Sequence, residues 1–233
     1  MKTAVVQAAR AQTAVVLLSG GMDSATLAYV ARDRGYGIIA LHVNYGQRTE
    51  AKERKCAQRI ASLLGAAEFF EVDIGYLARI GASALTDPAI PVMDYADTDA
   101  ELPATYVPFR NANLLSIATS LAEARGAEAI FIGAQASDYS GYPDCREEFM
   151  DAFQQVIDRG TRGSTRIEII APFVRMNKAG ILRIGLSLEV PYHETWSCYR
   201  RGDRACGRCG ACHFRRDAFR QVGFPDPIPY EGD

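Results

Sequence analysis

The feature that most constrains the fold is a glycine-rich loop, Ser19-Gly20-Gly21-Met22-Asp23-Ser24, placed directly after an apolar run, Ala14–Leu18. This run has no polar alternation, as is typical of a strand buried on both faces of a parallel sheet. The residues after the loop predict a helix from about Ser24 to Arg34, which ends at Gly35. A loop between the first strand and the first helix of an open α/β sheet lies at the edge where such sheets bind ligands.

The rest of the chain repeats this alternation of short apolar runs and amphipathic stretches, which predicts an α/β fold with a mainly parallel sheet. With 233 residues, 48% of them hydrophobic, the chain can bury one substantial core. We expect a disordered leader over residues 1–13, an α/β domain over 14–190 and a small tail over 191–233. Further strands are expected at 38–43, 69–72, 129–132 and 167–170, and further helices at 48–64, 111–125, about 146–159 and 177–188.

Two segments carry more specific expectations. On the helix at 48–64, Cys56, Ile60, Leu63 and Leu64 fall on one face at helical spacing and are predicted to be buried. The stretch Asp87–Pro108 is rich in Pro, Asp and Thr and is too long for an idle connection in a compact domain. We interpret it as a lid or a substrate-binding loop.

The glycine-rich loop has the chemistry of an anion site. Adjacent glycines allow positive φ and a close approach to a ligand, and amides at a helix N-terminus favour an anion. The Ser19 and Ser24 hydroxyls can donate to phosphate oxygens. The loop has no Walker lysine and no G-x-G-x-x-G spacing. A plain Gly-Gly turn, with Asp23 serving the helix dipole, is the alternative. The whole string nevertheless resembles the pyrophosphate-binding loop of PP-loop ATPases, which split ATP between the α and β phosphates to adenylate a substrate.

Four of the six cysteines, Cys198, Cys206, Cys209 and Cys212, lie within fifteen residues near the C-terminus. Four thiolates at this spacing predict a closed, structural Zn²⁺ site, and so short a tail would need a metal to order it. An iron–sulfur cluster is the alternative, but its fourth cysteine would follow the third rather than precede the series. Cys56 is interpreted as a small core residue. A nucleophilic role for Cys145, in a polar loop, is a minor hypothesis.

Charge and hydropathy exclude several classes of function. The net charge is −2 and the pI about 6.0, so no broad nucleic-acid-binding surface is expected. No apolar run approaches the length that crosses a bilayer. Residues 1–13 lack the apolar block of a secretory signal. We therefore expect a cytoplasmic protein with no membrane partner and no stable nucleic-acid partner.

Five further strings extend the pattern across the chain: His42–Arg48, Val107–Asn111, Asp138–Arg146, Ala171–Pro172 and Met176–Lys178. With the loop and the cysteines, they resemble the 7-cyano-7-deazaguanine synthase (QueC) family of the PP-loop superfamily, from about Val15 to Phe219. The resemblance implies a Rossmann-like parallel sheet sandwiched by helices, a small C-terminal zinc-binding subdomain, use of ATP with Mg²⁺, and a homodimer. It also implies conversion of 7-carboxy-7-deazaguanine and ammonia to 7-cyano-7-deazaguanine through adenylated intermediates.

The matching positions give a set of candidate site residues. Carboxylates in the polar loop can accept from the N–H groups of a deazaguanine, tyrosines can stack on its ring, and nearby cations can neutralise phosphate. Each of these features also has a plain structural reading, as a tight turn or a solvated cation. The candidates for catalysis are Asp23, Arg110 and Lys178; for nucleotide binding Ser19, Gly20, Gly21, Met22, Asp23, Ser24, His42, Arg48 and Arg110; and for substrate binding Asp138, Tyr139, Tyr142, Asp144, Cys145 and Arg146.

This chain departs from the family pattern at two positions. Thr49 stands where His is usual, and Phe109 stands where Gly is usual. Phe109 is expected to fill space that Gly leaves open and so to change the shape of the pocket. No general base is apparent in the sequence. Without a glutaminase domain, free ammonia is the expected nitrogen source.

Three rival functions stay open. A tRNA-thiolating PP-loop enzyme would suit the arginine-rich tail but not the acidic balance. A zinc-bearing, nucleotide-responsive DNA-binding regulator is disfavoured, because we expect the zinc loop to be too short to present a reading helix in addition to its metal ligands. A relative that attaches its deazapurine to another macromolecule is the third.

Overall fold

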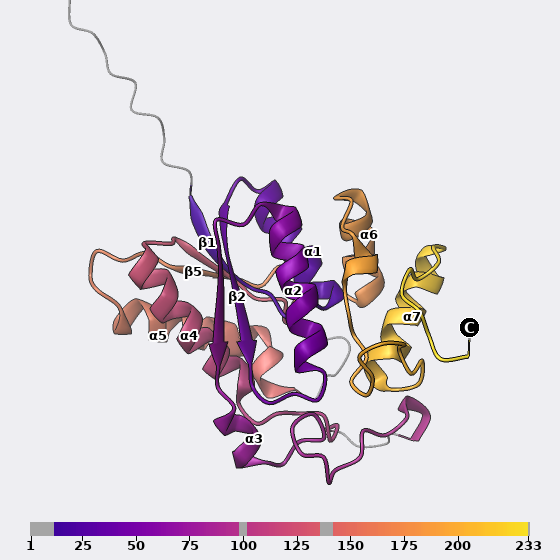
Figure 1. Cartoon of the computed structure of the whole chain (residues 1–233). Coiled ribbons are helices and arrows are strands. Elements are labelled where there is room, and N and C mark those ends of the chain that lie inside the picture. Colours follow the sequence, from indigo (N-terminus) through magenta and orange to yellow (C-terminus); the bar gives the residue numbers. More distant parts are fainter. Residues whose placement is uncertain (1–11, 98–101, 136–141, 233) are drawn as a thin grey trace, which may run out of the picture.

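The computed structural model describes residues 12–97, 102–135 and 142–232, and its centre is a five-stranded parallel sheet (Figure 1). The strand order is β3-β2-β1-β4-β5 and every neighbouring pair is parallel. The strands are β1 (Thr13–Leu17), β2 (Gly37–Asn44), β3 (Glu68–Asp73), β4 (Ala129–Phe131) and β5 (Glu168–Ile170). The predicted parallel α/β sheet is thereby confirmed.

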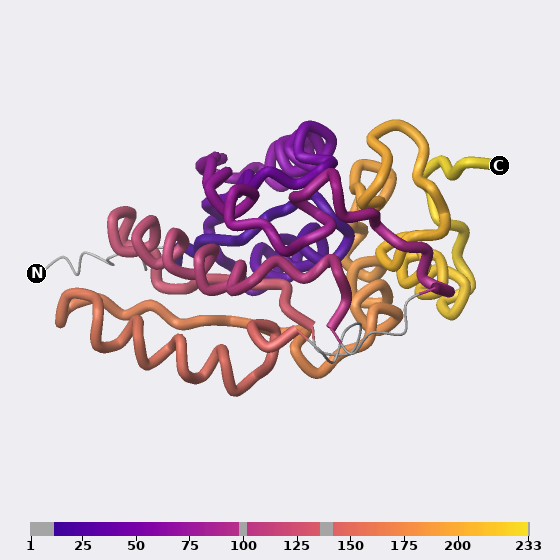
Figure 2. The backbone as a smooth tube through the Cα atoms, turned by 90° about the horizontal axis from the view of Figure 1, so that it is seen from below, coloured from indigo at the N-terminus to yellow at the C-terminus, as the bar shows by residue number. Residues whose placement is uncertain are grey.

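Helices cover both faces of the sheet, as Figures 1 and 2 show. The α-helices are α1 (Met22–Asp33), α2 (Glu50–Leu64), α3 (Tyr76–Ile80), α4 (Arg110–Arg125), α5 (Glu147–Gly160), α6 (Lys178–Ser187) and α7 (Gly210–Val222); short 3-10 turns are η1 (Tyr95–Asp97), η2 (Pro143–Cys145) and η3 (Tyr192–Glu194). None of the described helices is both long and apolar enough to span a membrane. Helices α1 and α2 lie on one face and α4 and α5 on the other, while α6 packs on α1 and α7 on α6.

The side chains of β1 supply both halves of the core. Ala14 and Val16 point to the cluster formed with α1 and α2, whereas Val15 and Leu17 point to the cluster formed with α4 and α5. Successive residues of a strand face opposite sides of its sheet, so a strand covered on both faces is apolar throughout. This is the physical reason for the unbroken apolar run that precedes the glycine-rich loop.

Several sequence expectations are corrected. Gln12 accepts a hydrogen bond from Gly37 N at 2.8 Å and Thr13 pairs with Gly37, so the last residues of the expected leader belong to the sheet. Residues 1–11 lie outside the described part. On α2 the buried face consists of Cys56, Ala57, Ile60, Ala61 and Leu64, whereas Leu63 is 41% exposed. The prediction of a buried side chain was therefore wrong for Leu63.

The C-terminal tail contains helix α7, which the sequence did not predict. Tyr192, Ala218 and Phe219 join the core cluster that contains α1. The Tyr192 hydroxyl lies 2.7 Å from Thr26 Oγ1 on α1. Arg215 is fully buried, and its guanidinium donates to Asp226 at 2.9 Å. The tail thus shares the apolar interior of the α/β part instead of packing as a separate unit.

Two arginines hold the segment expected to be a lid. Arg48 donates to the carbonyl oxygens of Ala84, Asp87 and Ile90, at 2.6, 2.8 and 2.7 Å. Arg200 in the tail donates to the Val92 carbonyl and pairs with Asp94. The first half of the Asp87–Pro108 segment is therefore fastened at both sides rather than free to swing; residues 98–101 lie outside the described part.

Phe109 has an unfavourable backbone conformation rather than an obstructive side chain. It occupies the N-cap of α4 with φ 55°, in the left-handed region, and its side chain is 62% exposed and does not line the cavity described below. The expectation that Phe109 fills the pocket is wrong. The left-handed backbone accounts for the usual Gly at this position, because Gly has no Cβ to clash.

Phe109→Gly is expected to raise the free energy of unfolding by about 1 kcal/mol, since it removes left-handed strain at little loss of buried contact. Chemical denaturation measures this change. Phe109→Ala keeps a Cβ and serves as the matched control, which should not be stabilised. Equal stabilisation of both variants would show that the side chain, not the backbone, is the source of strain.

Candidate active site

A cavity of about 300 Å³ opens at the carboxyl edge of the sheet, where the strand order reverses beside β1. Such reversal points are where open α/β sheets bind ligands. Its wall combines the glycine-rich loop, the ends of β1, β2 and β4, the beginnings of α4 and α6, and the tail. The polar or aromatic residues that line it are Ser19, Asp23, Ser24, Tyr45, Glu53, Arg110, Asn111, Gln135, Tyr142, Lys178, Trp196, Ser197, Tyr199 and Phe214.

The glycine-rich loop lies at the N-terminus of α1 and has the geometry of an anion cradle. Gly20 has φ +85°, and a Cβ there would overlap the backbone of Glu53 and Ala57 on α2. Gly21 caps α1, whose first amides have no side-chain cap. Ser19 and Ser24 bring their hydroxyl oxygens within 3.0 Å. The loop therefore offers backbone amides, two hydroxyls and the positive end of a helix dipole.

Asp23 and Lys178 meet at one side of this loop. Lys178 Nζ donates to Asp23 Oδ2 at 2.7 Å, and Gln135 Nε2 donates to the same oxygen at 3.2 Å. Asp23 Oδ1 is buried and has no hydrogen-bond partner in the described part of the chain. A buried carboxylate oxygen without a donor is suited to a cation ligand, because burial without a partner is otherwise costly.

The opposite wall is aromatic and cationic. Arg110 lies over the Tyr45 ring at 5.5 Å. The hydroxyl of Tyr142, one of the predicted substrate residues, lies 2.8 Å from Thr105 Oγ1, within hydrogen-bond distance. Burial raises the pKa of Tyr45 to about 12, so that phenol is neutral at physiological pH. This wall can hold a flat ring against aromatic faces beside a fixed positive charge.

Cys145 lines the cavity as expected, but its thiol is not activated. Burial raises its pKa to about 11, and Asn111 Nδ2 donates to its sulfur at 3.2 Å. The nucleophile in cysteine catalysis is the thiolate, which such an environment disfavours. The minor hypothesis of a nucleophilic Cys145 is therefore not supported.

Two predicted nucleotide ligands are engaged elsewhere. His42 is buried, and its ring nitrogens lie 2.9 Å from Leu18 O and 3.0 Å from Asn44 Oδ1. The Arg48 guanidinium donates its hydrogen bonds to carbonyl oxygens of the loop after α3, as described above. Neither residue lines the cavity. The structure gives both residues supporting contacts: His42 holds the end of β1, and Arg48 holds the loop after α3. Their roles in nucleotide binding stay predictions.

The predicted substrate residues divide in the same way. Asp144 is buried, and its Oδ2 accepts from the backbone amide of Asn111 at 2.8 Å, which fixes the beginning of α4. Arg146 is exposed and lies 3.5 Å from Glu148. Neither lines the cavity, and their roles in substrate binding stay predictions. Asp138 and Tyr139 lie outside the described residues.

Glu53 is the cavity residue that the sequence analysis missed. It projects from the first turn of α2, which was interpreted as an ordinary amphipathic helix. The available signal was its place in the first turn of the helix that follows the strand and its polar exit, Tyr45-Gly46-Gln47. Because a helix beginning at the carboxyl edge of a sheet points its first turn at the ligand site, acidic residues there merit attention.

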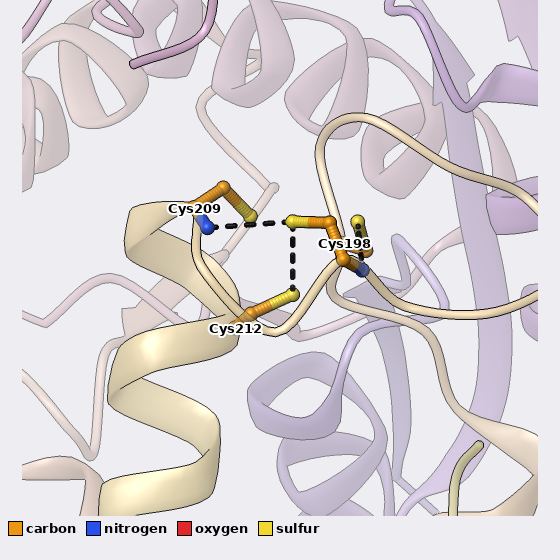
Figure 3. Close-up of side chains that lie close together, drawn as sticks. Cys198, Cys209 and Cys212 are labelled. Atoms are coloured by element: carbon orange, nitrogen blue, oxygen red, sulfur yellow. Dashed lines mark hydrogen bonds between the residues drawn. The ribbon is translucent and has the colours of Figure 1, made fainter. Parts of the chain in front are cut away.

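The four cysteines of the tail form one buried cluster. Their sulfur atoms all lie within 4.8 Å of one another, and Cys206 Sγ is 3.9 Å from Cys212 Sγ. Figure 3 shows Cys209 and Cys212 at the beginning of α7, with their thiols directed toward the loop that carries Cys198. This cluster can hold a metal ion. Beside it, the amide of Trp196 donates to Gly20 O at 2.9 Å, which joins the tail directly to the glycine-rich loop.

The parallel sheet, with this loop and cavity at its carboxyl edge, defines a PP-loop type of α/β protein. The family described as Queuosine biosynthesis protein QueC matches residues 13–223, and the chain belongs to this family.

Curated relatives match almost end to end. The chain is similar to the 7-cyano-7-deazaguanine synthase of Methanoculleus marisnigri, with 62% identity over 94% of this chain and 98% of that protein. It is similar to that of Methanospirillum hungatei JF-1, with 64% identity over 93% and 99%. A structure described as a predicted subunit of tRNA methyltransferase from Methanocaldococcus jannaschii is 13% identical, with TM-score 0.50 over 95% and 94% of the two chains. That likeness concerns the fold alone.

Proposed function

We propose that this protein is an ATP-dependent ligase that converts 7-carboxy-7-deazaguanine and ammonia to 7-cyano-7-deazaguanine. The observation that carries the proposal is one cavity in which an anion-binding loop faces an aromatic wall with a fixed cation. Relatives of 62% and 64% identity that bear the name of this activity support it.

In the adenylation step, a carboxylate oxygen of the substrate attacks the α-phosphorus of ATP and pyrophosphate leaves. The amides of Gly21 and Met22 and the hydroxyls of Ser19 and Ser24 hold the phosphates. Arg110 neutralises the developing charge of the acyl adenylate. Ammonia then attacks the carbonyl carbon and AMP leaves, which gives an amide. A second ATP adenylates the amide oxygen with release of pyrophosphate, and loss of AMP and of the two amide N–H protons gives the nitrile.

Two metals belong to the proposal. Mg²⁺ would be held by Asp23, whose Oδ1 has no hydrogen-bond partner among the described residues, and it would offset phosphate charge. Zn²⁺ would be held by the four cysteines. A tetrahedron with metal–sulfur bonds of about 2.3 Å has edges of about 3.8 Å, close to the 3.9 Å between Cys206 and Cys212. The zinc would be structural, because all four ligands come from the protein.

Assembly and location complete the proposal. We propose a homodimer and a tail over residues 191–233 that acts as a zinc-binding subdomain on the 14–190 domain. We also propose a cytoplasmic location, since none of the six cysteines forms a disulfide, as suits a reducing compartment. Light scattering in solution tests the dimer. Small molecules are the proposed partners. The expectation that the tail is too short to present a helix is wrong, because α7 contains Cys212 and continues beyond it. DNA binding is still not proposed, since Ala218 and Phe219 on this helix are buried in the core.

The decisive experiment incubates the protein with 7-carboxy-7-deazaguanine, ATP, Mg²⁺ and ammonium and follows the product by mass spectrometry. We expect the nitrile together with AMP and pyrophosphate. ADP in place of pyrophosphate would contradict the mechanism. Gel shifts with tRNA and with duplex DNA discriminate the two nucleic-acid rivals, and neither is expected to shift.

A further inference from the structure

Glu53 lines the cavity beside the glycine-rich loop. It is on α2, whose backbone is pressed against the phosphate loop at Gly20, and it lines the cavity together with Tyr45 and Arg110. Its Oε1 accepts from the Thr49 hydroxyl at 2.6 Å, and its Oε2 accepts from Gln47 Nε2 at 3.2 Å. A carboxylate can accept further hydrogen bonds beyond these two. Glu53 is therefore oriented by the protein and retains acceptor capacity toward a ligand.

Four other titratable groups of the described cavity wall are either paired with a charge or already protonated. Asp23 is paired with Lys178, and Arg110 stays protonated at any physiological pH. Burial raises the pKa of Tyr45 to about 12 and that of Cys145 to about 11, so both are protonated. Burial also raises the pKa of Glu53, which makes its carboxylate a stronger base than an exposed glutamate.

The proposed reaction requires such a group, because ammonia carries hydrogens and a nitrile nitrogen carries none. Attack of ammonia on the acyl adenylate forms a C–N bond, breaks the C–O bond to AMP and releases a proton. Adenylation of the amide and loss of the second AMP release the remaining N–H protons as the C≡N bond forms. Every hydrogen of the ammonia leaves as a proton, so no oxidant or reductant takes part.

We infer that Glu53 is the general base of the nitrogen steps, and that Thr49 is the residue that positions it. This inference rests on the proposed function. The carboxylate takes each N–H proton as AMP departs and returns it to solvent between steps. The Thr49 hydroxyl reaches Glu53 one helical turn away, and this contact was not apparent from sequence.

Three charged or titratable groups from neighbouring elements interact electrostatically with Glu53. His42 lies on β2, Tyr45 directly follows that strand, and Arg110 is at the beginning of α4. Arg110 stabilises the carboxylate form through its charge, and Thr49 and Gln47 do so through hydrogen bonds. Together they keep a partly desolvated carboxylate available as an acceptor, which is what a general base in a closed site requires.

The test separates adenylation from the nitrogen steps. With the unsubstituted protein, nitrile formation is established first, and its absence there would contradict the proposed function rather than the role of Glu53. Glu53→Gln should keep ATP–pyrophosphate exchange, dependent on 7-carboxy-7-deazaguanine, within about threefold, and lose about 10²–10⁴-fold in nitrile formation. Glu50→Gln, on the same helical turn but outside the cavity wall, is the matched control and should change neither rate.

If Glu53→Gln lost exchange and nitrile formation equally, Glu53 would act in substrate binding and the inference would be overturned. If the variant kept both rates, Glu53 would have no role in the reaction, which would also overturn it. Thr49→Val, which removes only the hydroxyl donor, should move the acidic limb of the pH profile for nitrile formation to higher pH, because the carboxylate loses a stabilising hydrogen bond. Thr49→Ser should leave that limb in place. An unshifted limb in Thr49→Val would overturn the role of Thr49.

Discussion

Asp23→Asn is expected to lower ATP–pyrophosphate exchange by about a thousandfold, the largest catalytic effect that the structure predicts. The carboxylate accepts from Lys178 at 2.7 Å and keeps Oδ1 without a hydrogen-bond partner in the described chain. An amide at this position has no charge with which to hold a cation. It would also leave the Lys178 ammonium, whose side chain is only 13% exposed, without a counter-charge.

A control variant and a variant of the partner residue test this expectation. Asp33→Asn changes an exposed aspartate at the other end of α1 and should leave exchange unchanged. Lys178→Met should by itself cost about 10²-fold, and adding it to Asp23→Asn should cost little more, because the two side chains act as a pair. If the Asp23→Asn variant kept more than about a tenth of the exchange rate of the unsubstituted protein, the pair of Asp23 and Lys178 would be structural rather than catalytic.

Cys212→Ser is expected to have the largest effect on stability, lowering the melting temperature by about 10 °C or more, with loss of bound zinc. Cys212 is 1% exposed, and its sulfur lies 3.9 Å from that of Cys206. With one thiolate removed, the remaining three hold the metal weakly, and metal binding no longer supports folding of the tail.

Nitrile formation should fall when the metal is lost, because residues of the tail, including Trp196 and Phe214, form part of the cavity wall. The Trp196 amide donates to Gly20 O, and Arg200 holds Asp94 in the loop beside the cavity. Metal analysis, thermal melting and the nitrile assay measure the three effects. Cys56→Ala is the control: Cys56 lies outside the four-sulfur cluster, so its variant should retain zinc. A variant Cys212→Ser that loses its zinc but melts and turns over normally would contradict a structural role for the metal.

The predictions from sequence succeeded where a signal lies within a few consecutive residues. An apolar run followed by two glycines, an aspartate and a serine specifies a buried strand, a tight glycine loop and a helix, because backbone conformation there is local. Four closely spaced cysteines likewise specify their cluster without reference to the rest of the fold. The fold brings four of the candidate site residues, Asp23, Arg110, Tyr142 and Lys178, to one cavity.

Only the tertiary structure decided what the remaining polar residues do. His42, Arg48 and Asp144 carry the right chemistry for a ligand, yet each hydrogen-bonds a distant backbone segment brought to it by the fold. Glu53 carries little local signal of a site, and it lines the cavity because α2 packs against the loop at Gly20. The physical reason is common to all four. Residue type sets which hydrogen bonds and charges a side chain can offer, and the neighbours supplied by long-range packing determine which of them a ligand can use.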